Sequence, residues 1–267
     1  MLFDIKEAAI SVTKEKDFRE KLFIGTFLVM LANFLSTFSF RHNSNISGAA
    51  GSASQNPLVS LNLIAGFAVL FVVLCYLLAF LHNKINNREM PRWSEVYNYF
   101  VKGFKLVLSN ILLGIPAFMF NGLLIYFQFI SRRYVYFYMI SVNPAAGNSP
   151  LGGVIRALVL LGWFVFVFVS ILQTAVFAKR LKFRDFFNLV KGYYSLAGNF
   201  VTFLVFALVV FALMTFWVWI SVAAKTAGPF SYLLILLISS PVFYIMTIYV
   251  DLLSQWAKKS YSMDEVE

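Results

Sequence analysis

Six long apolar runs constrain the fold of this chain more than any other feature of its sequence. Each run holds 19 to 25 residues, and about 20 helical residues are enough to cross the hydrocarbon core of a bilayer. Polar or turn-rich segments separate the runs, which predicts an all-α polytopic transmembrane helix bundle with six spans. The predicted spans are Leu22–Phe40, Leu58–Leu81, Leu106–Ile130, Val154–Ala178, Phe200–Ala224 and Phe230–Leu253.

The composition supports a lipid environment. Apolar residues make up 60% of the chain and charged residues only 13%, whereas a soluble domain carries about 25% charged residues. So much apolar surface needs lipid to cover it, because a water-soluble fold of this size cannot enclose it all. The single cysteine, Cys75, lies inside an apolar run and is predicted to be a buried thiol.

The sequence offers no catalytic constellation, so we predict that the protein is not an enzyme. It contains none of the common hydrolase, metalloprotease or phosphate-loop motifs. The two histidines, His42 and His82, fall on opposite sides of the predicted bilayer, where each is expected to be solvated in a loop. One cysteine and two separated histidines are too few ligands for a zinc site, so no metal or cofactor is expected.

The positions of the cationic residues predict the orientation of the chain. With six spans, 17 of the 22 Lys and Arg residues fall on the side that holds both termini. The positive-inside rule then places both termini in the cytoplasm of a multi-pass inner-membrane protein. The net charge of +10 does not predict nucleic-acid binding, because these cations lie in short loops where anionic lipid head groups are the nearer partner.

This topology divides the chain into three parts. Residues 1–21 form a polar cytoplasmic segment, in which Ala8 and Val12 share one face of a short surface helix. Residues 22–253 form the six-helix transmembrane domain. Residues 254–267 form a polar cytoplasmic tail that is expected to fray.

An amphipathic stretch, Met90–Leu106, leads into the third run. Its apolar residues are spaced to share one face of an α-helix, and Pro91 suits the start of a helix. The stretch predicts a helix that lies in the membrane interface, with its aromatic face toward lipid or protein and its lysines toward the head groups. The predicted face consists of Trp93, Val96, Tyr97, Phe100, Val101 and Phe104.

A second stretch, Lys182–Leu196, repeats this pattern ahead of the fifth run and predicts a second interfacial helix. With one residue skipped, the pair Lys102-Gly103 aligns with Lys191-Gly192. The alignment predicts an internal duplication with three parallel hairpins, all of which enter from the cytoplasm. The alternative is that every interfacial helix needs such a pattern, so that the two stretches match by chance.

The segment around the first stretch resembles a known family, the uncharacterised bacterial and archaeal integral membrane proteins catalogued only as a domain of unknown function. The resemblance covers roughly residues 20–255, and the chain departs from the family pattern at Ser94, where an acidic residue often follows the tryptophan. It implies a polytopic membrane protein and no particular activity. The residues that carry it are Met90-Pro91-Arg92-Trp93, Glu95 and Lys102-Gly103.

Two groups of residues are candidate sites. The first lies on the amphipathic stretches, where it would contact anionic lipid or a partner protein, or else only anchor the following spans. The second lies near mid-membrane, where it would line a solute cavity, or else pack between kinked helices. The first group is Trp93, Phe100, Lys102, Phe183, Phe187 and Lys191. The second group is Asn33, Pro116, Asn121, Ser240 and Pro241.

Two charged residues also fall within the apolar runs. Asp251 lies near the cytoplasmic end of the sixth run, where we expect it to reach water or to pair with Lys258 or Lys259 in a structural role. Arg156 is expected to extend to the outer head groups.

Two functions remain open from the sequence alone. The first is a non-enzymatic membrane scaffold or partner subunit, which would work through the amphipathic helices with lipid, a membrane protein or a second copy of the chain. The second is a small-solute transporter or channel that uses the mid-membrane polar positions. Parallel hairpins lower the expectation of a permease built from inverted repeats.

Overall fold

The computed structural model describes residues 5–47, 57–130, 150–188 and 241–264, together with single positions at 200–201, 203–205, 207–208 and 233. Every element within these residues is a helix, which agrees with the predicted all-α class. In chain order the helices are α1 (Ile5–Thr13), α2 (Phe18–Ser47), α3 (Pro57–Ile85), the 3-10 helix η1 (Trp93–Tyr99), α4 (Phe100–Ile130), α6 (Pro150–Arg180), α7 (Phe183–Phe186) and α11 (Val242–Asp264).

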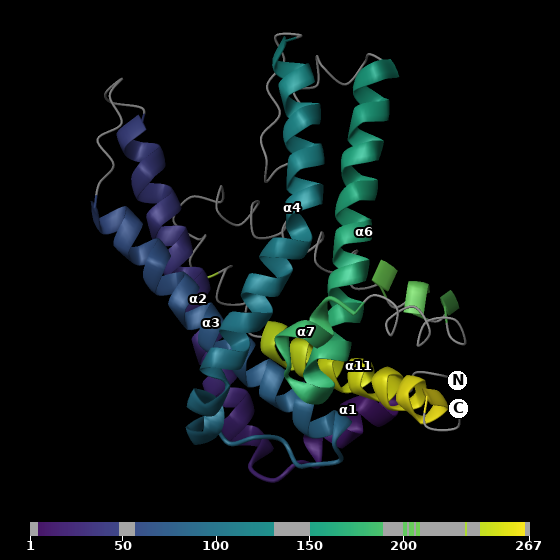
Figure 1. Cartoon of the computed structure of the whole chain (residues 1–267). Helices are drawn as coiled ribbons and strands as arrows, with labels where there is room; N and C mark the ends of the chain where they lie inside the picture. Colours follow the sequence, from purple (N-terminus) through teal and green to yellow (C-terminus); the bar gives the residue numbers. More distant parts are fainter. Residues whose placement is uncertain are drawn as a thin grey trace.

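The long helices form two pairs that meet at a common base. α2 packs along α3 and α4 packs along α6, and the two pairs lean apart as they leave the base (Figure 1). The short helices α1 and α7 lie at the base, where α11 runs crosswise to α4 and α6 (Figure 1). α11 packs on α1, α2, α3 and α6, so it joins the two pairs.

Three of the described helices are long and apolar enough to cross a membrane. They contain the segments Leu61–Ile85, Trp93–Pro116 and Leu161–Arg180, which overlap the second, third and fourth predicted spans. The first predicted span lies within α2. Most of the fifth and the outer half of the sixth lie outside the described residues. A membrane-helical architecture is therefore supported by three helices.

The start of the third span differs from the predicted interfacial α-helix. Trp93–Tyr99 forms a 3-10 helix that continues directly into α4. A 3-10 helix has three residues per turn, so it places Trp93 and Val96 on one side, and Val96 is buried there while Tyr97 is 68% exposed. The predicted six-residue aromatic face is thus divided between the protein core and the outer surface.

The C-terminal segment also differs from its prediction. Residues 254–264 do not fray but continue α11 as a regular helix. Leu253, Trp256 and Ala257 recur at helical spacing and are all buried, which gives this segment an apolar face to pack on the base. Residues 242–253, predicted as the inner half of the sixth span, belong to the same crossing helix.

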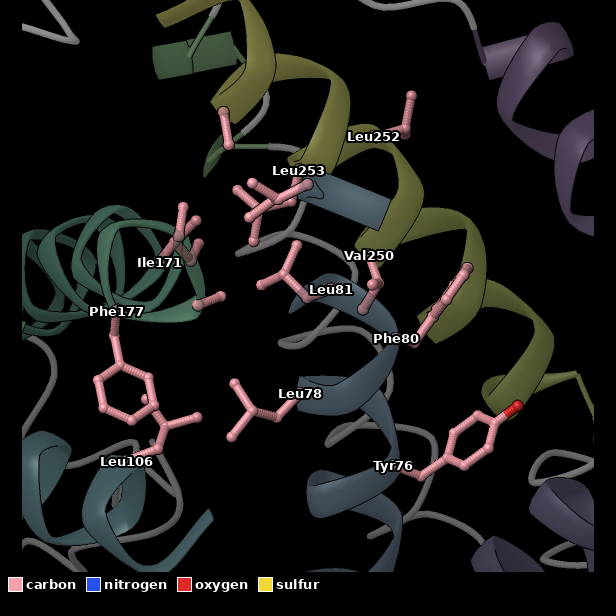
Figure 2. Close-up of a cluster of buried hydrophobic side chains, with 14 of the residues drawn as sticks. Tyr76, Leu78, Phe80, Leu81, Leu106, Ile171, Phe177, Val250, Leu252 and Leu253 are labelled. Atoms are coloured by element: carbon pink, nitrogen blue, oxygen red, sulfur yellow. The ribbon is translucent and has the colours of Figure 1, made fainter. Parts of the chain in front are cut away.

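The core lies at the base, where α3, α4, α6 and α11 converge. Figure 2 shows side chains of α3 and α11 that face each other, with those of α6 and α4 closing the cluster. Away from the base, the long helices carry large apolar side chains on their outer faces, such as Phe23 at 73% exposure and Phe67 at 70%. The labelled core residues are Tyr76, Leu78, Phe80, Leu81, Leu106, Ile171, Phe177, Val250, Leu252 and Leu253.

Two glycines allow helices to approach closely. A Cβ atom at Gly103 on α4 would lie 2.5 Å from the sulfur of Cys75 on α3, and a Cβ at Gly25 on α2 would overlap the ring of Phe243 on α11. Cys75 is a free, buried thiol, as predicted. The glycine of the Lys102-Gly103 pair therefore has a packing role between α3 and α4.

Candidate functional site

A buried charge cluster lies where α1, α3 and α11 meet. The Lys84 ammonium is 2.5 Å from a carboxylate oxygen of Glu15 and 3.7 Å from one of Asp251. The Asp251 carboxylate also accepts hydrogen bonds from the Ser11 hydroxyl at 3.2 Å and from the Gln255 amide at 3.0 Å. Buried ion pairs add little net stability, but they strongly disfavour any arrangement that leaves one charge unpaired. The cluster thus specifies how the two terminal helices dock on α3.

The partner of Asp251 differs from the predicted one. Asp251 is only 4% exposed and pairs with Lys84, a partner that was not predicted, whereas the Lys259 side chain lies outside the described residues. Its structural role at the end of the run agrees with the prediction, but its lysine comes from α3. No local pattern could have indicated this pair, because the two residues are far apart in the sequence and meet only through the crossing of α11.

The Met-Pro-x-Trp segment is held by the N-terminal segment. The buried Lys21 ammonium donates to the Met90 carbonyl oxygen at 3.0 Å, and the Met90 amide donates to Glu15 at 3.1 Å. The Trp93 indole nitrogen donates to the Lys21 carbonyl oxygen at 3.2 Å. Glu15 therefore connects the charge cluster to this segment. One continuous polar network ties α1, the start of α2, the end of α3 and the start of η1.

Trp93 faces the protein rather than the lipid. Its ring stacks on that of Tyr76 with centroids 4.0 Å apart and planes 15° apart, and the Phe243 ring lies 6.0 Å away. The packing of α2, α3, α11 and η1 is centred on these three rings, because the glycine at 25 leaves room for Phe243. The sequence prediction allowed either lipid or protein contact for Trp93, and the structure places it in a protein contact.

The other residues of the first candidate group divide between surface and interior. Phe100 is 40% exposed and tilts against Phe71, whereas Lys102 holds its ammonium 4.6 Å from the centre of the Tyr99 ring. Phe187 is 40% exposed and packs edge-to-face on Phe183.

In the second stretch, the buried aromatic residue is one that the candidate group omits. Phe186 is fully buried against Phe177 of α6. It aligns with Val96 of the first stretch, which is also buried. Lys191 lies outside the described residues.

The described members of the mid-membrane group lie on three different helices or helix ends. Asn33 is half-buried on α2, Pro116 is exposed within α4, and Pro241 is exposed at the residue before α11. The backbone of Asn121 continues α4, while its side chain and the whole of Ser240 lie outside the described residues. The two prolines thus face outward rather than toward one another.

A polar seam that the sequence analysis missed lies between α4 and α6. The Ser170 hydroxyl donates to the side-chain oxygen of Asn110, and Ser109 beside it is fully buried. Gln173, one turn further along α6, is also fully buried, and neither its amide nitrogen nor its amide oxygen has a hydrogen-bond partner among the described residues. An unsatisfied buried amide costs about 1–3 kcal/mol, so Gln173 marks the least satisfied point of this seam.

His82 is not solvated in a loop as predicted. It lies in the last turn of α3 and is half-buried, with Nδ1 2.6 Å from the Ala178 carbonyl oxygen. Since a carbonyl only accepts, the Nδ1 proton must donate, and His82 thereby caps one of the free carbonyls near the end of α6. His42 lies within α2, and nothing of its side chain is described.

No metal centre is evident in the part of the chain that the structure describes. No group of three or more His, Cys, Asp or Glu side chains there is placed to hold a metal ion. The hollows found at the surface adjoin Glu15 instead, and one of them is lined by Thr13, Glu15, Asp17, Phe18 and Arg19. The geometry of the described residues therefore centres on packing and charge pairing between helices.

Comparison with known proteins gives one match. The sequence model of a family described as "Protein of unknown function (DUF4013)" matches residues 58–224, which is more than half of the chain. The matched region runs from the second predicted span to the end of the fifth and includes both amphipathic stretches. No curated protein and no solved structure matches the chain.

Proposed function

This chain belongs to the family described as Protein of unknown function (DUF4013), and we propose that it is a non-enzymatic integral membrane scaffold or partner subunit. The observation that carries the proposal is an outward-facing apolar surface at the start of the third span. Tyr97 and Val101 are each 68% exposed and Phe104 is 61% exposed, although neighbouring residues of the same segment are packed into the base. We call Tyr97, Val101 and Phe104 the η1–α4 surface.

The rigid support under this surface favours an interaction role. Trp93 and Val96 hold the inner side of η1 on α3, and the polar network through Lys21 and Met90 fixes the preceding loop. A rigid, pre-organised surface loses little conformational entropy when it binds. Large exposed apolar patches beside charged residues commonly mark interaction sites, here with lipid, a membrane protein or a second copy.

The proposed topology keeps the predicted spans and both termini in the cytoplasm of an inner membrane, except that residues 242–253 of the sixth run lie in α11 at the base. The three membrane-length helices of the described region support it, together with the surplus of Lys and Arg on the base side. In this arrangement the base with α1, η1, α7 and α11 lies at the cytoplasmic face. The charge cluster then lies at the edge of the bilayer, where the free-energy cost of its burial is lower than at mid-membrane.

The proposed internal duplication has a backbone counterpart. Asn87 and Leu181 end α3 and α6 in the left-handed region, both at φ 56°, and each precedes one of the two short helices. Asp17, at φ 58°, stands in the same way directly before α2. Left-handed residues are uncommon outside glycine, so one in each of the three links supports the proposed repeats, although the alignment of Val96 with Phe186 matches Leu181 with Pro91 and not with Asn87.

A non-enzymatic role fits the use that the described residues make of their charged groups. Lys84 pairs with Glu15 from the α1–α2 link and with Asp251 of α11, and Lys21 is buried on a backbone carbonyl. Each of these groups is engaged in a contact between segments of the chain. A catalytic residue would instead need access to a substrate.

A native gel tests the scaffold role. The wild-type chain and two double variants are extracted from the host membrane with a mild detergent and compared. Under the proposal the wild-type chain migrates in an assembly larger than one chain with its micelle. Y97S/V101S releases the single chain, whereas the matched control F23S/F27S, which changes two exposed residues of α2, does not. A wild-type chain that migrates alone, or a control that behaves like the first variant, contradicts the proposal.

A second candidate function rests on the α4–α6 polar seam. The buried, unsatisfied amide of Gln173, one turn from the Ser170–Asn110 hydrogen bond, is a polar group that a solute or ion passing between the helices would bind. Under this alternative, the purified chain in proteoliposomes conducts a small solute, and Gln173→Leu or Asn121→Leu abolishes the flux. Flux that Y97S/V101S leaves intact and Gln173→Leu removes would favour transport over the scaffold role.

A further inference from the structure

Three cations near the start of α4 lack an acidic partner. Arg88, Lys102 and Lys105 have no carboxylate within ion-pair distance among the described residues, where Lys84 forms the ion pairs instead. The Lys102 ammonium lies over the Tyr99 ring, 4.6 Å from its centre. Arg88 and Lys102 both lie close enough to His82 to act on it electrostatically. Glu95 of η1 also acts electrostatically on Tyr99 and offsets part of this positive charge, but it forms no ion pair with the three cations among the described residues.

One of these cations lies within the apolar outer face of α4. Lys105 follows Phe104 and falls one helical turn after Val101, and all three are exposed. The exposed apolar face continues along the same side of α4 through Leu108 and Leu112. A lysine in such a face directs its ammonium toward the head groups while its methylenes follow the apolar surface.

We propose that Arg88, Lys102 and Lys105 form a discrete binding site for one anionic phospholipid. This inference rests on the proposed membrane topology and deepens it by assigning the lipid class. The phosphate of the head group lies between the three cations, beside the Tyr99 ring. One acyl chain follows the exposed face of α4 from Phe104 toward Leu112.

The combination of charge and apolar surface selects a phospholipid over other anions. A free phosphate would use the cations but not the apolar face of α4, and a zwitterionic lipid would bring its own positive charge to a site that already has three. A Lys or Arg near the surface contributes about 1 kcal/mol to attraction by anionic lipid. Three such cations, with Lys105 one helical turn from Lys102 and an acyl contact beside them, would give retention beyond that of the general positive charge of the base.

Native mass spectrometry of the full chain in detergent tests the site. The chain is titrated separately with dioleoyl phosphatidylglycerol, dioleoyl phosphatidylcholine and sn-glycerol 3-phosphate. We expect one tightly retained phosphatidylglycerol, at least tenfold weaker retention of phosphatidylcholine, and no retention of glycerol phosphate. The variant R88Q/K102Q/K105Q should lose the tight phosphatidylglycerol by about tenfold in apparent affinity, or about 1.4 kcal/mol.

The matched control is K6Q/K14Q/K16Q, which removes the same charge from exposed positions of the N-terminal segment. It should retain phosphatidylglycerol like the wild-type chain. Equal losses in both triple variants would overturn the site, because only net charge would then matter. Equal retention of phosphatidylcholine or tight retention of glycerol phosphate would overturn the lipid assignment. These results are independent of the native-gel assay, so the site can fail while the scaffold role stands, and the reverse.

Discussion

The Trp93 indole stacks face-to-face on the phenol ring of Tyr76, with ring centroids 4.0 Å apart, and also donates a hydrogen bond to the Lys21 carbonyl oxygen. This contact joins the amphipathic stretch to the second span and to the start of the first. It gives the tryptophan a structural role inside the protein. Trp93 is thus the point at which the start of the third span is fixed to the base.

Replacing Trp93 should therefore cost stability rather than only surface contact. Trp93→Ala removes the stack and the hydrogen bond, and we expect a loss of roughly 3 kcal/mol, within the range for large aromatic truncations. The measurement is thermal unfolding of the detergent-solubilised chain. Tyr97→Ala on the exposed side of the same helix is the control and should change stability by less than about 0.5 kcal/mol. Equal effects of the two variants would contradict the inward placement of Trp93.

Gly103 should not tolerate a side chain. Gly103→Ala places a methyl group 2.5 Å from the Cys75 sulfur, and overpacking of this kind costs about 1–3 kcal/mol. Adding Cys75→Ala removes the sulfur and should restore part of the loss, which a double-mutant cycle measures as a coupling free energy. Independent, additive effects of the two substitutions would show that the close approach of α3 and α4 does not limit packing.

The free energy of unfolding should fall more when the charge cluster loses its one cation than when it loses all of its charges. Lys84→Met leaves Glu15 and Asp251 buried without their ion-pair partner, and we expect a loss of about 3–5 kcal/mol. The triple variant K84M/E15Q/D251N should be milder, because no uncompensated charge remains. Hydrogen exchange of α1 and α11 provides a second measurement and should rise in K84M. An unaltered exchange rate in both helices would contradict the proposed docking role.

Stability should depend on pH through Lys258. Burial and the nearby Lys84 charge lower the pKa of Lys258, although Asp251 partly opposes them. The folded state then releases this proton at lower pH than the unfolded state, so the free energy of unfolding rises as pH increases toward 10.5. Lys258→Met should remove this part of the rise. The measurement is the denaturation midpoint against pH, and identical slopes for the two chains would contradict the assignment.

Much of the fold was predictable because it depends on short-range patterns. The second, third and fourth runs lie within α3, α4 and α6, and the buried thiol of Cys75 follows from its place in an apolar run. The short helix at residues 5–13 agrees with the predicted face through Ala8 and Val12, which are buried against the base. The periodicity of apolar residues carries this information along the chain.

The candidate site was predicted less well. The stretch that begins at Met90 was predicted as an interfacial helix, but its tryptophan, its Gly103 and its Met90 serve contacts within the protein. Lys84 was not foreseen as a partner of Asp251, and the prediction that His82 is solvated in a loop was wrong. Both contacts join residues of separate helices. The periodicity of apolar residues along one helix does not indicate which helices become its neighbours.

The sequence alone establishes that this protein is helical and suited to lipid. The length of its apolar runs matches the thickness of a bilayer, and their apolar content matches its hydrocarbon core. The crossing of α11 over the base, the pairing of Lys84 with acids from both ends of the chain, and the inward turn of Trp93 came from packing in three dimensions. Those contacts form between segments remote in sequence, and their free energy exists only once the helices have docked.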